Sequence, residues 1–278
     1  MSGRVVSLGN AVVDVALAVP SLPRRGDDVL ADGAPEAGGG GLRAVLAARG
    51  AGAEALFAGR IGTGPFGDLI RAALRRADVA MPLAPVAEAD SGIAITLVEP
   101  DGERSFVTTT GAELADPDLD GLTIGHDDAV HVSGYGLQEP GRAAAVGRFV
   151  AGLPESVTVL LDPGPFGVGS APPALLGRID WWSGTAAEAG GGDPERAAAA
   201  LAARVRRGAV VRLGADGCVL AERRADPVRL PAPAVRVRST NGAGDTHVGT
   251  FLAHLVTGAD PIAAAVAATA AASAFVAR

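Results

Sequence analysis

A glycine-rich stretch that ends in an aspartate, Ser239–Thr246, has the residue types of a phosphoryl-transfer site. Its glycines let the backbone approach a ligand closely and turn N–H groups toward it. Apolar residues then recur three or four positions apart, as on one face of a helix; they are Val248, Phe251, Leu252, Leu255 and Val256. The first turn of a helix has unpaired N–H groups and a partial positive charge that suit a phosphate. Asp245 would then lie beside the phosphate, where it can accept a proton from an attacking hydroxyl.

The residues around this turn decide between a structural and a catalytic interpretation. The alternation in Val235–Arg238 predicts a strand before the turn. For the bare motif, a strand-to-helix turn capped by Asp245 is the favoured interpretation, because short motifs have many false positives. The longer string Ser-Thr-Asn-Gly-Ala-Gly-Asp-Thr-His resembles the carboxy-terminal signature of the ribokinase-like carbohydrate kinases of the phosphofructokinase-B type. The resemblance implies that Gly242, Ala243 and Gly244 form an anion hole, that Asp245 is the general base and that Asn241 contacts the nucleotide. Ser239 stands where the family usually has Asp.

Composition narrows the class of protein. A chain of 278 residues with 48% apolar residues can form one large α/β domain or two small ones. A net charge of −7 argues against nucleic acid or an anionic membrane as a standing partner. All 24 basic residues are arginine, which excludes a Walker-type phosphate loop and a Schiff-base lysine. Cys218 is the single cysteine, so there is no internal disulfide or cysteine-based zinc site, and we expect a buried, inert strand residue.

The chain enters a strand-like run directly after Met1–Arg4, so we expect no signal peptide. Alanine-rich stretches at 195–205 and 261–277 are interrupted by polar residues, and alanine contributes weakly to membrane insertion. We therefore expect buried-face helices, no membrane span and a cytoplasmic location.

Strand-like and helix-like segments alternate along the chain, which predicts an α/β fold with a mainly parallel sheet between two layers of helices. The predicted strands are 4–10, 129–134, 157–161, 179–183 and, as a strand-turn-strand unit, 209–220; the predicted helices are 44–49, 68–77, 142–153, 193–207 and 261–277. Two β-rich segments without helices, about 12–36 and 90–111, look like a lid inserted into one domain of residues 1–278. Asp101-Gly102 is a hairpin turn signal in the second segment, and residues 21–37 are predicted to form a loop. The family resemblance implies a small β-sheet lid over the sugar.

The acceptor side of the predicted site begins with a carboxylate in an apolar run. Asp14 lies in Val12–Val19, where a charge is costly without a partner, although an edge-strand residue facing solvent is an equal alternative. The glycine run Gly38–Gly41 can cradle an anion or simply allow close packing. The resemblance implies that Asp14, Gly38 and Gly39 bind the acceptor, and that Arg43 replaces the family's usual Asn in this subsite.

Arg43 offers up to five donors and no acceptor, which allows three arrangements. It can bind an anionic group of the acceptor, turn outward into a surface salt bridge, or pair with Asp14 and silence the site.

The nucleotide side is implied by the resemblance alone. Glu188 matches the family glutamate that orders magnesium-bound water, while Thr185 replaces an Asn; a first-turn glutamate favoured by the helix dipole is the structural alternative for Glu188. Leu213, Gly214 and Gly217 match the family's nucleotide-side turn, and Thr269 replaces an Asn near the adenine. His131 has no second histidine at ligand spacing and is predicted to be a strand residue rather than a ligand.

These residues predict ATP-dependent phosphoryl transfer to a hydroxyl of a sugar or nucleoside. The resemblance implies Mg²⁺ as a cofactor, a monovalent cation such as K⁺ as an optional one, and a homodimer through the lid. Two alternatives remain at this point. Departures from the family at Arg43, Thr185, Ser239 and Thr269 fit a kinase fold that has lost catalysis and serves as a binding or regulatory protein. A dinucleotide-dependent oxidoreductase is disfavoured, because Gly38–Gly41 does not form G-x-G-x-x-G after a first strand.

Overall fold

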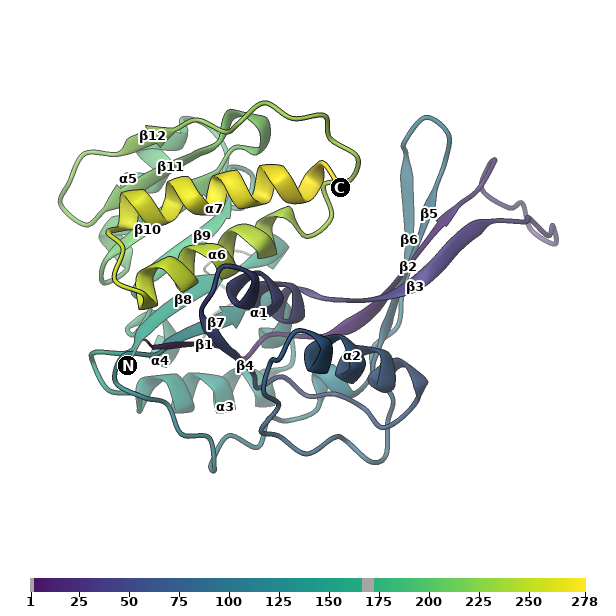
Figure 1. Ribbon diagram of the computed structural model, residues 1–278, viewed down its shortest axis with the longest axis horizontal. Helices are drawn as coiled ribbons and strands as arrows, with labels where there is room; N and C mark the ends of the chain where they lie inside the picture. The colour runs from purple at the N-terminus through teal and green to yellow at the C-terminus, as the bar shows by residue number, and fades with distance from the viewer. Residues whose placement is uncertain (1–2, 167–172) are drawn as a thin grey trace.

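The computed structural model describes residues 3–166 and 173–278, which fold around an eight-stranded sheet (Figure 1). The strand order is β12-β11-β10-β9-β8-β7-β1-β4. All neighbours from β4 to β10 are parallel, whereas β11 and β12 are antiparallel additions at one edge. The strands are β1 Arg4–Ser7, β4 Glu54–Phe57, β7 Ala129–Ser133, β8 Thr158–Asp162, β9 Trp181–Thr185, β10 Gly208–Arg212, β11 Cys218–Glu222 and β12 Val228–Leu230. The predicted α/β class with a mainly parallel sheet is confirmed.

Helices cover both faces of this sheet. One layer is α1 Gly40–Gly50, α6 Ala243–Val256 and α7 Pro261–Val276; the other is α3 Pro140–Ala151, α4 Pro173–Leu176 and α5 Pro194–Arg204. Successive strand residues point to opposite layers. The adjacent tryptophans of β9 illustrate this alternation, since Trp181 packs in the α1–α6–α7 layer and Trp182 in the α3–α5 layer. Burial on both faces of the sheet explains why most residues of its central strands are apolar.

A second, four-stranded sheet projects from the main body, as Figure 1 shows. Its strands are β2 Val12–Ala18, β3 Asp32–Gly38, β5 Ile93–Val98 and β6 Arg104–Thr108, in the order β3-β2-β5-β6. Helix α2, Pro65–Arg76, packs beside it over a core that includes Val13, Ile70 and Leu74. Gly102 turns the predicted hairpin between β5 and β6 with a φ of +88°. The two inserted segments expected from the sequence therefore meet in one small sheet.

Several local predictions need correction. The alternating segment Val235–Arg238 forms no strand; all four residues are exposed, because no neighbouring strand pairs with either edge. The predicted loop 21–37 instead contributes the edge strand β3, where Pro35 is tolerated because an edge strand leaves some N–H positions unpaired. Helices α1 and α2 begin before the predicted residues 44 and 68, at Gly40 and Pro65, since glycine and proline are accepted in a first turn.

Within residues 3–166 and 173–278, no helix has the length and apolar content needed to cross a membrane.

Candidate active site

The turn before α6 has the geometry expected of an anion site. Gly242 is the N-cap residue and has a left-handed backbone with a φ of 83°, which favours glycine. The first intrahelical N–H donor is Thr246, which bonds the Gly242 carbonyl at 2.9 Å. The N–H of Ala243 donates to the Thr240 carbonyl at 3.3 Å, so it is turned into the loop. The N–H groups of Gly244 and Asp245 come before the first helical bond, and the helix offers them no acceptor.

Asp245 lies in the first turn of α6 among charged groups of both signs. Burial raises the pKa of its carboxyl to about 6, helped by the negative charges of Asp162 and Asp14 and opposed by Arg43 and Arg212. A carboxyl group with this pKa is ionised at neutral pH and still basic enough to take a proton from a hydroxyl that is being consumed. This geometry fits the predicted general base.

Asp245 faces a small group of polar atoms at the carboxyl end of β1 and β7. A Cβ on Gly40 would lie 3.0 Å from Asp245 Oδ1, 3.6 Å from Ser133 Oγ and 3.7 Å from Asn10 Oδ1. Asn10 Oδ1 is buried and has no hydrogen-bond partner among the described residues. Strand β1 lies between β4 and β7, so the strand order reverses at β1. Parallel sheets bind ligands at the carboxyl ends of the strands where such a reversal occurs. The structure thus places an unused acceptor atom and the Asp245 carboxylate around the same glycine.

Arg43 and Asp14 form an ion pair at 2.5 Å between Nη2 and Oδ2, with exposed side-chain fractions of 16% and 20%. Of the three arrangements considered for Arg43, the structure shows the pair with Asp14 and not an outward-facing salt bridge. Asn241 Nδ2 also approaches Asp14 Oδ2 at 3.4 Å. Gly38 and Gly39 are needed here, because a Cβ on Gly38 would overlap the Asp14 carboxylate and Gly39 has a φ of 94°. The predicted acceptor residues therefore lie together.

The predicted nucleotide residues are only partly brought together. A cavity of about 460 Å³ is lined by Thr185, Leu213 and Gly214, with Arg212 beside them. Gly217 is not part of its lining; it accepts a bond from the Leu213 N–H at 2.8 Å and has a φ of +89°, so its visible role is to shape the turn.

Two further nucleotide predictions lie elsewhere. Thr269 is 4% exposed and contacts Cys218 Sγ at 3.4 Å and His247 Nε2 at 3.3 Å, inside the helix–sheet interface. Its short side chain does not reach the cavity, so the adenine contact predicted for Thr269 is not supported. Asn241 lies at Asp14, on the acceptor side.

The sequence interpretation missed Arg212 and Asp162, which meet at the carboxyl ends of β10 and β8. Arg212 Nη1 donates to Asp162 Oδ2 at 3.0 Å, to Ser183 Oγ at 3.1 Å and to the Gly244 carbonyl at 3.5 Å. Its Nη2 lies 3.6 Å from Glu188 Oε2. An arginine at the end of the apolar run Ala209–Leu213 was the available signal, because a charge in such a run needs a partner.

Glu188 is held by the loop that follows β9. Its Oε2 accepts the Thr185 N–H at 2.6 Å, and the Glu188 N–H donates to Thr185 Oγ1 at 3.2 Å, as in a capping box. No cluster of three or more acidic, histidine or cysteine side chains that could hold a metal occurs among the described residues. Mg²⁺ commonly binds one carboxylate together with phosphates and waters, so Glu188 fits a contact through water.

His131 and Cys218 behave as predicted. His131 is buried in β7 with Nδ1 3.0 Å from Ser7 Oγ, and burial lowers its pKa to about 4. Cys218 is buried in β11, where burial raises the pKa of its thiol.

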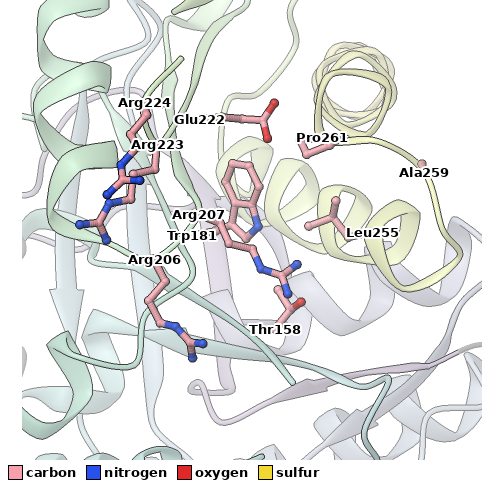
Figure 2. A pocket seen from close by; sticks show the side chains of 10 residues that line it. All are labelled: Thr158, Trp181, Arg206, Arg207, Glu222, Arg223, Arg224, Leu255, Ala259 and Pro261. Atoms are coloured by element: carbon pink, nitrogen blue, oxygen red, sulfur yellow. The ribbon is translucent and has the colours of Figure 1, made fainter. Parts of the chain in front are cut away.

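A second cavity, of about 580 Å³, lies at the opposite, amino-terminal end of the sheet (Figure 2). Thr158 and Trp181 begin β8 and β9 there, and four arginines surround them: Arg206, Arg207, Arg223 and Arg224. Figure 2 shows these guanidinium groups pointing in different directions, and Arg206 is paired with Glu155 at 2.6 Å. The predicted site residues do not line this cavity, which leaves the Asp245 region as the candidate active site.

Comparisons with known proteins identify the family of the chain. The profile of the pfkB family carbohydrate kinases matches residues 2–278. The uncharacterized sugar kinase YegV of Escherichia coli K12 is 33% identical and covers 94% of this chain and 84% of its own. An ATP-dependent ribose-1-phosphate kinase of Halopiger xanaduensis is 32% identical over 58% of this chain and 54% of its own. Arabidopsis thaliana ribokinase, solved with ribose and ATP, superposes with a TM-score of 0.82 at 26% identity, over 99% of this chain and 93% of that one. The chain belongs to the pfkB family of carbohydrate kinases.

Proposed function

We propose that this carbohydrate kinase transfers the terminal phosphoryl group of ATP to a hydroxyl of a sugar or nucleoside, with Asp245 as the general base. The observation that carries the proposal is the position of Asp245. It combines the unpaired first-turn N–H groups of α6, a pKa of about 6 and a carboxylate oxygen directed at the Gly40, Ser133 and Asn10 group.

The residues present support one sequence of events. The acceptor hydroxyl gives its proton to Asp245 while its oxygen bonds to the γ-phosphorus, and the bond from that phosphorus to ADP breaks. Backbone N–H groups of Gly244 and Asp245 stabilise the charge on the transferring group. Asp14, Gly39 and Asn10 orient the acceptor.

Mg²⁺, when bound, would neutralise phosphate charge, and Glu188 would hold it through water. Thr185, Leu213 and Gly214 would line the nucleotide subsite. K⁺ is the optional monovalent cation, and the protein acts in the cytoplasm, where ATP is supplied.

The small sheet is proposed to act as a lid that excludes water and so prevents ATP hydrolysis. It is also the proposed surface of a homodimer. The support for a dimer is the exposure of Phe106 and Val107 on β6, at 65% and 58%.

A second candidate is a kinase-fold binding protein without catalysis. The Arg43–Asp14 pair favours it, because the pair occupies a carboxylate that the proposed acceptor uses. The retained Asp245 turn favours the kinase.

ADP formation measured on a panel of acceptors separates the two candidates. The panel contains sugars, nucleosides and phosphorylated sugars, since a relative is named for ribose-1-phosphate, and Mg²⁺ and K⁺ are varied. The kinase proposal requires acceptor-dependent ADP formation that Asp245→Asn abolishes. Acceptor binding in calorimetry without turnover for every compound would support the binding protein.

A further inference from the structure

We propose that Arg43 and Arg212 form an arginine clamp that contacts the transferring phosphoryl group from two sides; this inference rests on the proposed function. Neither residue belongs to the glycine turn, and they come from different elements, α1 and β10.

The clamp is defined by contacts with the two glycines of the turn. A Cβ on Gly242 would lie 2.8 Å from Arg43 Nη1, and a Cβ on Gly244 would lie 3.2 Å from Arg212 Cζ and Nη2. Each guanidinium therefore packs against one glycine of the turn whose N–H groups are proposed to hold the phosphoryl group. The positive charges of both arginines also lower the pKa of Asp245.

Each arginine binds a carboxylate and has further N–H donors that this carboxylate does not use. Arg43 uses Nη2 for Asp14, which leaves Nη1 on the side of Gly242. Arg212 uses Nη1 for Asp162, whereas its Nε is buried and has no hydrogen-bond partner among the described residues. A buried donor without an acceptor is costly, so this group is suited to a ligand that supplies an acceptor atom.

The chemistry of the transferring group matches these donors. Phosphoryl transfer places negative charge on three oxygens, and stabilisation of that charge by fixed cations is the main contribution that a protein makes. The chain contains no lysine, so a permanently charged cationic side chain at this site must be an arginine. The clamp moves no proton, because guanidinium stays protonated; Asp245 alone accepts the hydroxyl proton.

The clamp gives the Arg43–Asp14 ion pair a function. Asp14 holds the arginine toward the turn before substrate binds, so the pair preorganises the site. The acceptor then shares Asp14 through its remaining oxygen, since the ion pair and the Asn241 contact both use Oδ2.

The test compares binding of MgADP alone with binding of MgADP plus aluminium fluoride, a mimic of the transferring group, by calorimetry. In the parent protein, aluminium fluoride should strengthen binding at least tenfold. Arg43→Gln should lose that gain while MgADP affinity changes less than threefold. Arg212→Gln should also lose the gain, and its loss of MgADP affinity should be smaller than that loss, because Arg212 also lines the nucleotide cavity. Arg49→Gln is the control for Arg43, because Arg49 lies on the same helix and pairs with the exposed Asp78 at 2.8 Å.

Kinetics on an acceptor from the panel give a second readout. Arg43→Gln should lower kcat by about 10²–10³-fold, the effect of removing a donor to transition-state charge, with acceptor KM nearly unchanged. If Arg212→Gln does not fold, Arg212→Lys replaces it, since this variant keeps the positive charge. Arg212→Lys should lose most of the aluminium fluoride gain, because lysine lacks the planar set of donors of arginine.

An undiminished aluminium fluoride gain in the folded Arg43 and Arg212 variants would overturn the clamp. So would a raised acceptor KM with parental kcat in Arg43→Gln, which would assign Arg43 to the acceptor. Both results leave an active parent enzyme and hence the proposed function intact. A parent protein with neither turnover nor an aluminium fluoride gain would contradict the proposed function itself.

Discussion

Gly40 lies directly against Asp245: a Cβ at residue 40 would come within 3.0 Å of Asp245 Oδ1. This relationship joins the start of α1, which belongs to the acceptor side, to the first turn of α6, which carries the proposed base. Gly40 has a helical backbone conformation that any residue can adopt. Glycine is needed at this position because a side chain would contact Asp245.

Gly40→Ala should therefore displace the carboxylate by a few tenths of an ångström and lower kcat about tenfold. Gly50→Ala is the matched control at the other end of α1, where no atom lies within 4 Å of the added Cβ. Steady-state kinetics of both variants measure the difference. Equal kcat values for the two variants would show that residue 40 does not position Asp245.

Asp245→Asn should lower kcat by roughly 10²–10⁴-fold, because the amide cannot accept the hydroxyl proton. ATP affinity should change much less, since the backbone N–H groups of the turn remain. Phosphoryl transfer and equilibrium ATP binding are measured on the same folded variant. Near-parental kcat would remove Asp245 from the role of base.

The activity should depend on pH through Asp245. Its pKa of about 6 predicts that kcat/KM rises about tenfold per pH unit below 6 and levels off above it. His131 and His247 are buried with pKa values of about 4 and 3, so neither accounts for a limb near 6. The profile is recorded with saturating MgATP, and a flat profile between pH 5 and 7 would contradict the assignment.

The same pKa has a consequence for stability. Burial raises the folded-state pKa of Asp245 from 3.8 to about 6, so ionised Asp245 destabilises the folded protein. Its destabilising effect develops as pH rises from about 4 to 6 and is complete above the folded pKa. Asp245→Asn should therefore be more stable than the parent at pH 7, by roughly 1–3 kcal/mol. Denaturant unfolding at pH 4 and pH 7 tests this; the same difference at both values would argue against a raised pKa.

The lid proposal predicts a change in hydrogen exchange. The turn at Asp101-Gly102 should become more protected when the acceptor binds, because closure of the small sheet buries it. Exchange is followed by mass spectrometry with and without saturating acceptor. Unchanged exchange would count against a mobile lid and leave the kinase assignment in place.

The sequence was most informative where local rules decide the structure. The turn at Gly242–Asp245 combines a left-handed glycine, the start of a helix and a first-turn carboxylate, and each is visible in neighbouring residues. The predictions were wrong for segments whose structure depends on pairing with a strand that is distant in the sequence. Val235–Arg238 alternates like a strand but finds no partner, whereas Asp32–Gly38 has a loop composition and is held by β2.

The charged residues of the site show the same division. Arg212 and Asp162 are 50 positions apart, and their contact depends on strand order, which no local pattern encodes. The pairing of Arg43 with Asp14 was one of three arrangements compatible with the sequence, and the packing of α1 against the small sheet selects it.

The two tryptophans of β9 give the protein an optical property. They are neighbours in sequence but face opposite helical layers, so each samples a different half of the core. Trp182 lies over Gly184, where a Cβ would be 2.7 Å from ring atom Cζ2 and 3.1 Å from Glu188 Oε2. Its indole is thus adjacent to the carboxylate of the proposed nucleotide side, while Trp181 is stacked edge-on against Phe251 at 5.2 Å. We therefore expect charge that arrives beside Glu188 to change the emission of Trp182 more than that of Trp181.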